Sequence, residues 1–254
     1  MKKNGKLKKA AAALAVALVW LCLWLGSSFF AKRAGFGLLL PTPADVCGAL
    51  RELLRTKSFY LSVGRSLLRV LTGWAGGVAA GTALAALTSF SKPVHLFFAP
   101  LLHIIKATPV ASFIILALVL MKKDSVPAFT GFLMSLPLVW ANVSEGLTAP
   151  NEQLTEMARA FGMSRKNELQ YIRLPALAPY FTAAATTSMG LTWKACIAAE
   201  VICTPQSSIG SGIYNAKVYL ETPSLFAWTL TVILFSVLLE MLIKKLLRKG
   251  EIKK

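Results

Sequence analysis

The chain contains six stretches of about 20 apolar residues, each bounded by charged or turn-forming residues. About 20 helical residues rising 1.5 Å each cover the roughly 30 Å hydrocarbon core of a bilayer. Every backbone amide in that core needs a partner within the protein, a condition that an α-helix satisfies. The pattern therefore predicts an all-α, polytopic membrane protein with about six transmembrane helices. The expected spans are 10–30, 66–90, 96–121, 126–147, 176–201 and 225–247.

Composition supports this class of protein. Of the 254 residues 56% are hydrophobic and only 15% are charged, which excludes a disordered tail and argues against an ordinary soluble domain. The net charge of +17 does not require nucleic acid, because the positive-inside rule and anionic lipid also explain a basic excess on so apolar a chain. We expect a membrane-lipid environment and no nucleic-acid partner.

The distribution of charge predicts the orientation. Six spans place both termini on one side of the membrane, and that side holds 16 Lys and Arg residues against 8 on the other. Cytoplasmic loops carry the excess of positive charge. We therefore expect a multi-pass protein of the cell membrane with both termini in the cytoplasm.

Residues 1–62 are expected to form an N-terminal span and an extracytoplasmic amphipathic segment, and residues 63–254 the membrane core. The first apolar stretch is long for a signal peptide and lacks an A-x-A exit, which favours a retained helix over a cleaved one. After Pro41 and Pro43, apolar residues from Val46 to Leu54 recur at helical spacing between charges. They predict an amphipathic helix on the outer surface, with a solvated connector as the alternative.

Catalytic signatures are missing from the sequence. It has no G-x-x-x-x-G-K-[ST] phosphate loop, no G-x-S-x-G elbow and no H-E-x-x-H pair. His95 and His103 have no carboxylate at ligand spacing between them, and the four cysteines form no C-x-x-C, so no metal site is predicted. The chain is expected not to be an enzyme, and energy for any uphill work must come from another chain or from ions.

The most informative segment lies between the fourth and fifth spans. Leu154, Met157, Ala158 and Phe161 form an apolar stripe at helical spacing, and Gly162 follows where a left-handed residue ends a helix. A second short helix is expected to begin with Ser164 as its cap and to stop at Pro175. Two short helices joined at a glycine form a rigid knob whose apolar stripe suggests a partner protein.

This segment resembles the EAA motif, roughly E-A-A-x3-G-x9-I-x-L-P, of permease subunits of bacterial ATP-binding-cassette (ABC) importers. The departure is Met157 at the first alanine position, which keeps the stripe apolar. In that family the motif is a coupling element that docks on the ATPase subunit, so the resemblance implies an ATPase-coupling role for Met157, for Phe161 and for the matching residues. The matching residues are Glu156, Ala158, Gly162, Ile172, Leu174 and Pro175.

Further segments are similar to the nitrate, sulfonate and taurine type of importer permease. They are LPTPADVCGALREL, SLLRVLTGW, GLTWKACIAAEVI and the C-terminal run that begins GSGIYNAKVYLETPSLFAW. The resemblance implies import of a small, mostly anionic solute or a vitamin precursor. It also implies two copies of a separate ABC ATPase, a second permease copy in a homodimer and an extracytoplasmic substrate-binding protein. ATP and magnesium would bind the ATPase, and no cofactor is expected here. The sequence does not identify the substrate.

Glycines on the second span indicate close helix packing. Gly73, Gly77 and Gly81 repeat on one face, the small-xxx-small pattern of membrane helices. Packing within the chain is preferred to a dimer seam, which remains the alternative.

Ionisable residues within the spans are candidates for the translocation path. Lys106, Lys194 and Glu200 lie deepest, and such groups are costly in lipid. The lysines could help an anion across, or they could snorkel to the surface or pair with Glu200 or Glu145. Pro109 could bend the third span and expose carbonyls to the path, or could make an ordinary kink.

Two other classes of function remain as alternatives. An ion-driven secondary transporter would need internal inverted repeats, which are not visible in the sequence. An integral membrane enzyme would need convergent acid, base or metal groups, which the sparse acids and two histidines do not supply.

Overall fold

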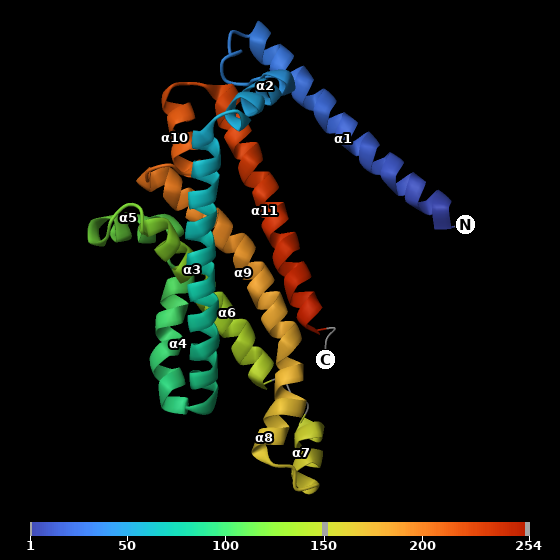
Figure 1. The fold of residues 1–254 in the computed structure, drawn as a ribbon, viewed down its shortest axis with the longest axis vertical. Coiled ribbons are helices and arrows are strands. Elements are labelled where there is room, and N and C mark those ends of the chain that lie inside the picture. Colours follow the sequence, from blue (N-terminus) through green and yellow to red (C-terminus); the bar gives the residue numbers. More distant parts are fainter. Residues whose placement is uncertain (1, 149–151, 252–254) are drawn as a thin grey trace. The chain divides into compact units, whose positions relative to one another are not determined.

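The computed structural model describes residues 2–148 and 152–251, and these are almost entirely helical (Figure 1). This confirms the predicted all-α class. The α-helices are α1 (Lys2–Arg33), α2 (Pro43–Leu54), α3 (Lys57–Phe90), α4 (Lys92–Ala107), α5 (Val110–Leu120), α6 (Val126–Thr148), α7 (Glu152–Ala160), α8 (Arg165–Glu168), α9 (Leu174–Cys203), α10 (Ile209–Val218) and α11 (Thr222–Glu251), with a π-helix, η1 (Leu169–Arg173), between α8 and α9.

The chain divides into two compact units. The first combines Met1–Tyr60 with Gly212–Thr231, and the second combines Leu61–Ser211 with Val232–Lys254. The predicted division of the sequence after residue 62 stays a prediction.

Aromatic side chains hold the first unit together. The indole Nε1 of Trp24 in α1 donates a hydrogen bond to the carbonyl of Pro41 at 3.0 Å, and its ring stacks on Phe226 of α11 with 6.1 Å between centroids. Phe59 packs against Trp228 at 5.2 Å. These rings provide a large apolar contact area for few ordered side chains.

The predicted amphipathic helix is present as α2. Pro43 occupies its first turn, where a missing N–H costs nothing, and Thr42 caps it. The backbone N–H of Asp45 donates to the Thr42 hydroxyl at 3.2 Å, and the backbone N–H of Thr42 donates to the Asp45 carboxylate at 3.0 Å. This reciprocal capping box fixes the start of the helix. Val46 is its buried residue.

Helices α6 and α9 form the centre of the second unit and run antiparallel. At one end the Cys196 thiol donates to the carbonyl of Pro127 at 3.1 Å, and at the other end Gly146 lies against Tyr180. Since 23 helical residues rise about 34 Å, α9 accompanies α6 through a whole membrane thickness.

Within the part of the chain that the structure describes, four helices are long and apolar enough to cross a membrane by themselves, namely α1, α3, α6 and α11. The pair α4 and α5 adds a fifth crossing if it forms one broken span. Helix α9 falls outside this group, although it is long enough and lies along α6. The described residues thus contain four or five candidate spans, and the sixth span that the sequence predicted, over 176–201, stays a prediction.

The third predicted span is not one continuous helix. Helices α4 and α5 meet at an angle of 105°, with Thr108 ending the first and Pro109 capping the second. Proline has no N–H to donate back along the helix, and its ring excludes α-helical dihedrals at the preceding residue. The bend anticipated at Pro109 is therefore a sharp break between two short helices.

Glycines of α3 bring its backbone close to α6. A Cβ atom at Gly73 would overlap the carbonyl of Ala128, and one at Gly77 would overlap the hydroxyl of Ser135. At Gly81 it would lie 2.8 Å from the carbonyl oxygen of Leu136. All three glycines thus face another helix of the same chain, which is the close approach that small residues permit.

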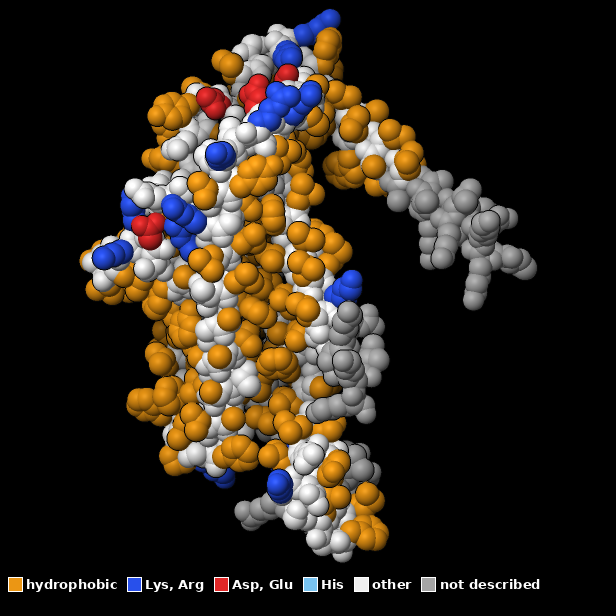
Figure 2. Space-filling view, viewed as in Figure 1, with side chains coloured by type: hydrophobic (Ala, Val, Ile, Leu, Met, Phe, Trp, Pro, Cys, Tyr) orange, Lys and Arg blue, Asp and Glu red, His pale blue; other side chains and the backbone are white. Residues whose placement is uncertain are grey.

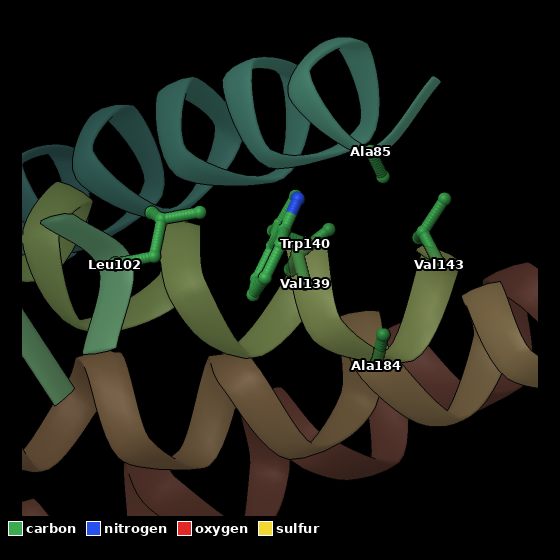
Figure 3. Packing of buried hydrophobic residues seen from close by; sticks show 6 residues of the cluster. All are labelled: Ala85, Leu102, Val139, Trp140, Val143 and Ala184. Carbon is green, nitrogen blue, oxygen red and sulfur yellow. The ribbon is translucent and has the colours of Figure 1, made fainter. Parts of the chain in front are cut away.

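Trp140 of α6 anchors a buried cluster between four helices (Figure 3). Its Nε1 donates to the Thr88 hydroxyl on α3 at 2.9 Å, which satisfies the only polar group of the ring. His95 and His103 of α4 lie against the same ring, at 5.9 and 6.3 Å between centroids. The cluster consists of Ala85, Leu102, Val139, Trp140, Val143 and Ala184.

Candidate functional site

The segment between α6 and α9 forms two short helices joined by a left-handed glycine. Gly162 has a φ of +68°, as the sequence predicted. The backbone N–H of Met163 donates to the carbonyl of Ala158 at 2.9 Å, which is the long hydrogen bond of a Schellman motif. Most other residues would be strained at this φ, because a Cβ atom disfavours the left-handed region. The motif sets the angle at which the chain leaves α7.

The second helix of the segment is capped and braced. The Ser164 hydroxyl accepts a hydrogen bond from the N–H of Asn167 at 3.3 Å, which is the predicted cap. Farther along, the Arg173 guanidinium donates to the Glu168 carboxylate at 2.8 Å through Nη2 and 3.0 Å through Nε. Both bonds end on the same oxygen, Oε1, and they link the last residue of α8 to the last residue of η1.

The prediction that Pro175 stops the second helix is wrong. The chain stays helical from Arg165 through η1 into α9, and Pro175 lies in the first turn of α9. The helical hydrogen bonds change from the α to the π pattern here, since the N–H of Leu174 donates to the carbonyl of Leu169, five residues earlier. A π turn accommodates the proline without ending the helix. The segment therefore continues directly into α9.

Large apolar side chains lie exposed on this segment (residues 152–175), which we call the coupling loop after the role that its resemblance to the EAA motif predicts. Phe161 is 83% exposed and Met157 is 51% exposed, whereas Ala158 of the same predicted stripe is 3% exposed. Tyr171 and Leu174 add exposed area, and apolar side chains show at this end of the protein in Figure 2. Of the other predicted residues, Glu156 is exposed and Ile172 is half-buried, while the Leu154 side chain lies outside the described residues.

The four residues predicted for a translocation path occupy different surroundings. Lys106 is exposed in the last turn of α4, beside the break at Pro109. Lys194 is exposed on α9, whereas Glu200 on the same helix has no exposed surface. The structure therefore does not bring these residues together into one site.

Glu200 is held by three donors. The Ser66 hydroxyl donates to it at 2.7 Å, the Arg69 guanidinium at 3.2 Å and the backbone N–H of Gly210 at 3.1 Å. A Cβ atom at Gly210 would overlap Glu200, so only glycine lets the start of α10 reach this carboxylate. A buried charge persists only with such partners.

Arg69 extends this network toward the surface. It also donates to the carboxylate of Asp124 at 3.0 Å and to the carbonyl of Gln206 at 3.3 Å. The network joins α3, α9 and two connecting segments. The alternative in which a lysine pairs with Glu200 is wrong, because Arg69 is its ion-pair partner. Arg69 lies within the second predicted span, so its cost in lipid was the signal that could have indicated a buried partner.

A pocket of about 370 Å³ lies between α9 and α11. Lys194 and Glu240 place opposite charges in its wall. Each would cost about 2.5 to 3.5 kcal/mol if it faced lipid at the centre of a helix. The lining residues are Thr186, Thr187, Gly190, Leu191, Lys194 and Glu240. Sequence reasoning found Lys194 but missed Glu240, which lies in the most apolar part of the last span.

The comparisons with known proteins identify the class. The sequence profile of the binding-protein-dependent transport system inner membrane components matches residues 77–249. The protein belongs to this family of transport permeases. The matched region contains α6, α9 and the coupling loop.

Three relatives support the assignment. A probable ABC transporter permease protein of Brucella melitensis is 24% identical over 232 residues, covering 91% of this chain and 94% of the relative. A putative aliphatic sulfonates transport permease protein of Bacillus subtilis is 24% identical, covering 74% and 68%. A nitrate import permease protein of Synechocystis is 24% identical, covering 85% and 78%.

A solved structure shares the fold. The chain resembles part of an amino acid ABC transporter crystallised with histidines, with a TM-score of 0.64 and 18% sequence identity. The match covers 81% of this chain and 98% of the other. At this identity the likeness concerns the fold alone.

Proposed function

We propose that the protein is the membrane permease subunit of an ABC importer that moves a small solute into the cytoplasm. The observation that carries the proposal is the coupling loop, which presents Phe161 and Met157 to solvent on a rigid two-helix segment. A large exposed aromatic on a polar segment suggests a protein partner. We assign that partner as a separate ATPase, which holds ATP and magnesium.

The geometry supports mechanical coupling through α9. The Gly162 turn and the Glu168–Arg173 brace make the loop stiff, and the helix that begins at Arg165 continues through η1 into α9. Closure of two ATPase subunits on ATP would displace the loop and, with it, the helix that carries Lys194. In a dimer of permeases this motion switches the path between outward-open and inward-open states.

The remaining assignments complete the complex. Two ATPase copies, a second copy of this chain and an extracytoplasmic binding protein are the expected partners, with both termini in the cytoplasm. The solute is a small anion, as the names of the sulfonate and nitrate relatives suggest, or a taurine-like compound or vitamin precursor, as the resemblance of the sequence implies. Lys106 and Lys194 are the charges proposed to attract it within the path, and Pro109 and Glu200 stay predictions for the same path.

A substitution at Phe161 tests the docking role. Phe161→Ala removes the largest exposed apolar side chain of the coupling loop and should reduce copurification of the co-expressed ATPase at least tenfold, as expected for an aromatic hot spot. Membrane expression should not change, because the side chain packs against little else. Phe36→Ala, at an aromatic that is 60% exposed outside the loop, should have no effect. Equal ATPase recovery from both variants would contradict the docking assignment.

The glycine turn provides a second test. Gly162→Pro forces φ to about −65° and should abolish ATPase association, whereas Gly162→Ala carries the left-handed penalty of about 1 to 2 kcal/mol and should weaken it. Gly48→Ala in α2, where a methyl group meets open space, serves as the control. Pull-down of the ATPase from membranes with normal permease content is the measurement. Normal association of the proline variant would remove the turn from the mechanism.

A further inference from the structure

The pocket between α9 and α11 presents one positive and one negative charge. Lys194 projects from α9 and Glu240 from α11, and both line the same pocket. Neither has an ion-pair partner among the residues that the structure describes. Two opposite charges that are held apart, instead of being joined to each other, leave both ends available to a third group.

The lining residues lie on one face of α9. Thr187, Gly190, Leu191 and Lys194 follow the helical spacing of three and four residues, so their side chains share one side. A Cβ atom at Gly190 would overlap the Glu240 carboxylate, which would then have to move away. The glycine thus lets the carboxylate of α11 rest against the α9 backbone, one turn from Lys194.

We propose that this pocket binds small zwitterions, which carry one ammonium and one anionic group, during their passage through the permease. The Glu240 carboxylate receives the ammonium and the Lys194 ammonium receives the anion, while the threonine hydroxyls offer further hydrogen bonds. The volume of about 370 Å³ lies within the range of small-molecule sites. The inference rests on the proposed permease function and specifies its solute class.

The charge arrangement favours this class over simple anions. An anion without an ammonium is attracted by Lys194 but repelled by Glu240. A zwitterion satisfies both groups and brings no net charge into the membrane. A cation without an anionic group is attracted by Glu240 but repelled by Lys194.

Direct binding to the purified permease–ATPase complex in nanodiscs, without the external binding protein, tests the proposal. Labelled 2-aminoethanesulfonate is the probe, with unlabelled β-alanine, ethanesulfonate and ethylamine as competitors. We expect β-alanine to compete and the two singly charged compounds to compete at least about tenfold more weakly. Ethanesulfonate competing as well as unlabelled 2-aminoethanesulfonate would overturn the proposal.

Variants assign the two charges. Lys194→Met and Glu240→Gln should each weaken probe binding at least about tenfold, and Lys194→Arg should retain it. Gly190→Ala should also weaken binding although it changes no charge, because it displaces the carboxylate. Lys244→Met on α11 and Glu145→Gln on α6 are matched controls outside the pocket, and binding should be unchanged in both.

The double variant separates solute binding from mutual pairing. If Lys194 and Glu240 serve only each other, Lys194→Met combined with Glu240→Gln restores wild-type affinity, which overturns the proposal. If they hold the solute, the double variant binds no better than the weaker single variant. A complex that retains its ATPase but binds no zwitterion refutes only this inference, whereas failure of any ATPase to copurify refutes the proposed function itself.

Discussion

At the scale of single residues, the stability of the second unit depends on the donors around Glu200. Arg69→Met removes the ion-pair partner and leaves a fully buried carboxylate, which should lower the free energy of unfolding by about 3 to 5 kcal/mol. Denaturant titration of the purified protein measures this. Arg65→Met, at an exposed arginine one turn earlier on α3, should change stability little. Equal losses in the two variants would show that the network contributes nothing specific.

The capping box of α2 predicts a pH dependence at another residue. Hydrogen bonds from the hydroxyl and the backbone N–H of Thr42 lower the pKa of Asp45 from its ordinary value of 3.8. The stabilisation is therefore present above pH 3.8 and is lost as the pH falls through the lower folded-state pKa. Hydrogen exchange of the α2 amides, corrected for intrinsic rates, should show this loss, and Asp45→Asn should abolish the pH dependence. Identical pH profiles in both proteins would exclude Asp45 as the titrating cap.

Residues were predictable where a local pattern defines them. Gly162 and Ser164 follow from helix-ending and capping chemistry, which acts over a few neighbouring residues. Glu200 and Arg69 are 131 positions apart, and their pairing depends on how α3 packs against α9. No spacing rule encodes that contact, so the sequence indicated only that each charge needed a partner.

At the scale of helices, the seam between α3 and α6 gives a packing prediction. Gly77→Ala places a methyl group where the Ser135 hydroxyl lies, and such overpacking should cost about 1 to 3 kcal/mol. Ser135→Ala in the same chain should recover part of the loss. Gly76→Ala is the control, since a Cβ there meets only the Phe132 ring at 3.4 Å. The measurement is the thermal unfolding temperature in detergent. A lower unfolding temperature for Gly76→Ala than for Gly77→Ala would contradict the close packing of α3 against α6 at Gly77.

The sequence predicted a helix correctly wherever a long apolar stretch was enough to define it. The prediction of one continuous helix for the third span was wrong. The hydropathy of the sequence is continuous across Thr108 and Pro109, whereas the break in the backbone depends on local dihedral angles. At Pro175 the opposite error occurred, because the sequence predicted a break where the helix continues. A proline in the first turn of a helix is compatible with helix continuation, and only the hydrogen-bond ladder of η1 shows that the chain continues.

At the scale of the whole molecule, the orientation can be tested with the natural cysteines. Cys47 is exposed on α2, whereas Cys196 and Cys203 are buried. In a Cys22→Ser background, a membrane-impermeant maleimide should label Cys47 from outside intact spheroplasts. A Lys166→Cys variant that also lacks Cys47 should be labelled only after permeabilisation. Labelling of this second variant from outside would invert the assigned orientation and remove the coupling loop from the cytoplasm.

Helix α9 has a consequence for how the protein is made. Ser188 lies against α3 and Cys196 against α6, and α9 is less apolar than the helices that can cross a membrane by themselves. Whether a segment enters the bilayer during synthesis depends on its own free energy of transfer from water to lipid. The threonines, the lysine and the glutamate of α9 make this free energy less favourable. We therefore expect α6 to stay beside the insertion machinery until α9 has been made, so that the two helices enter the bilayer as a pair.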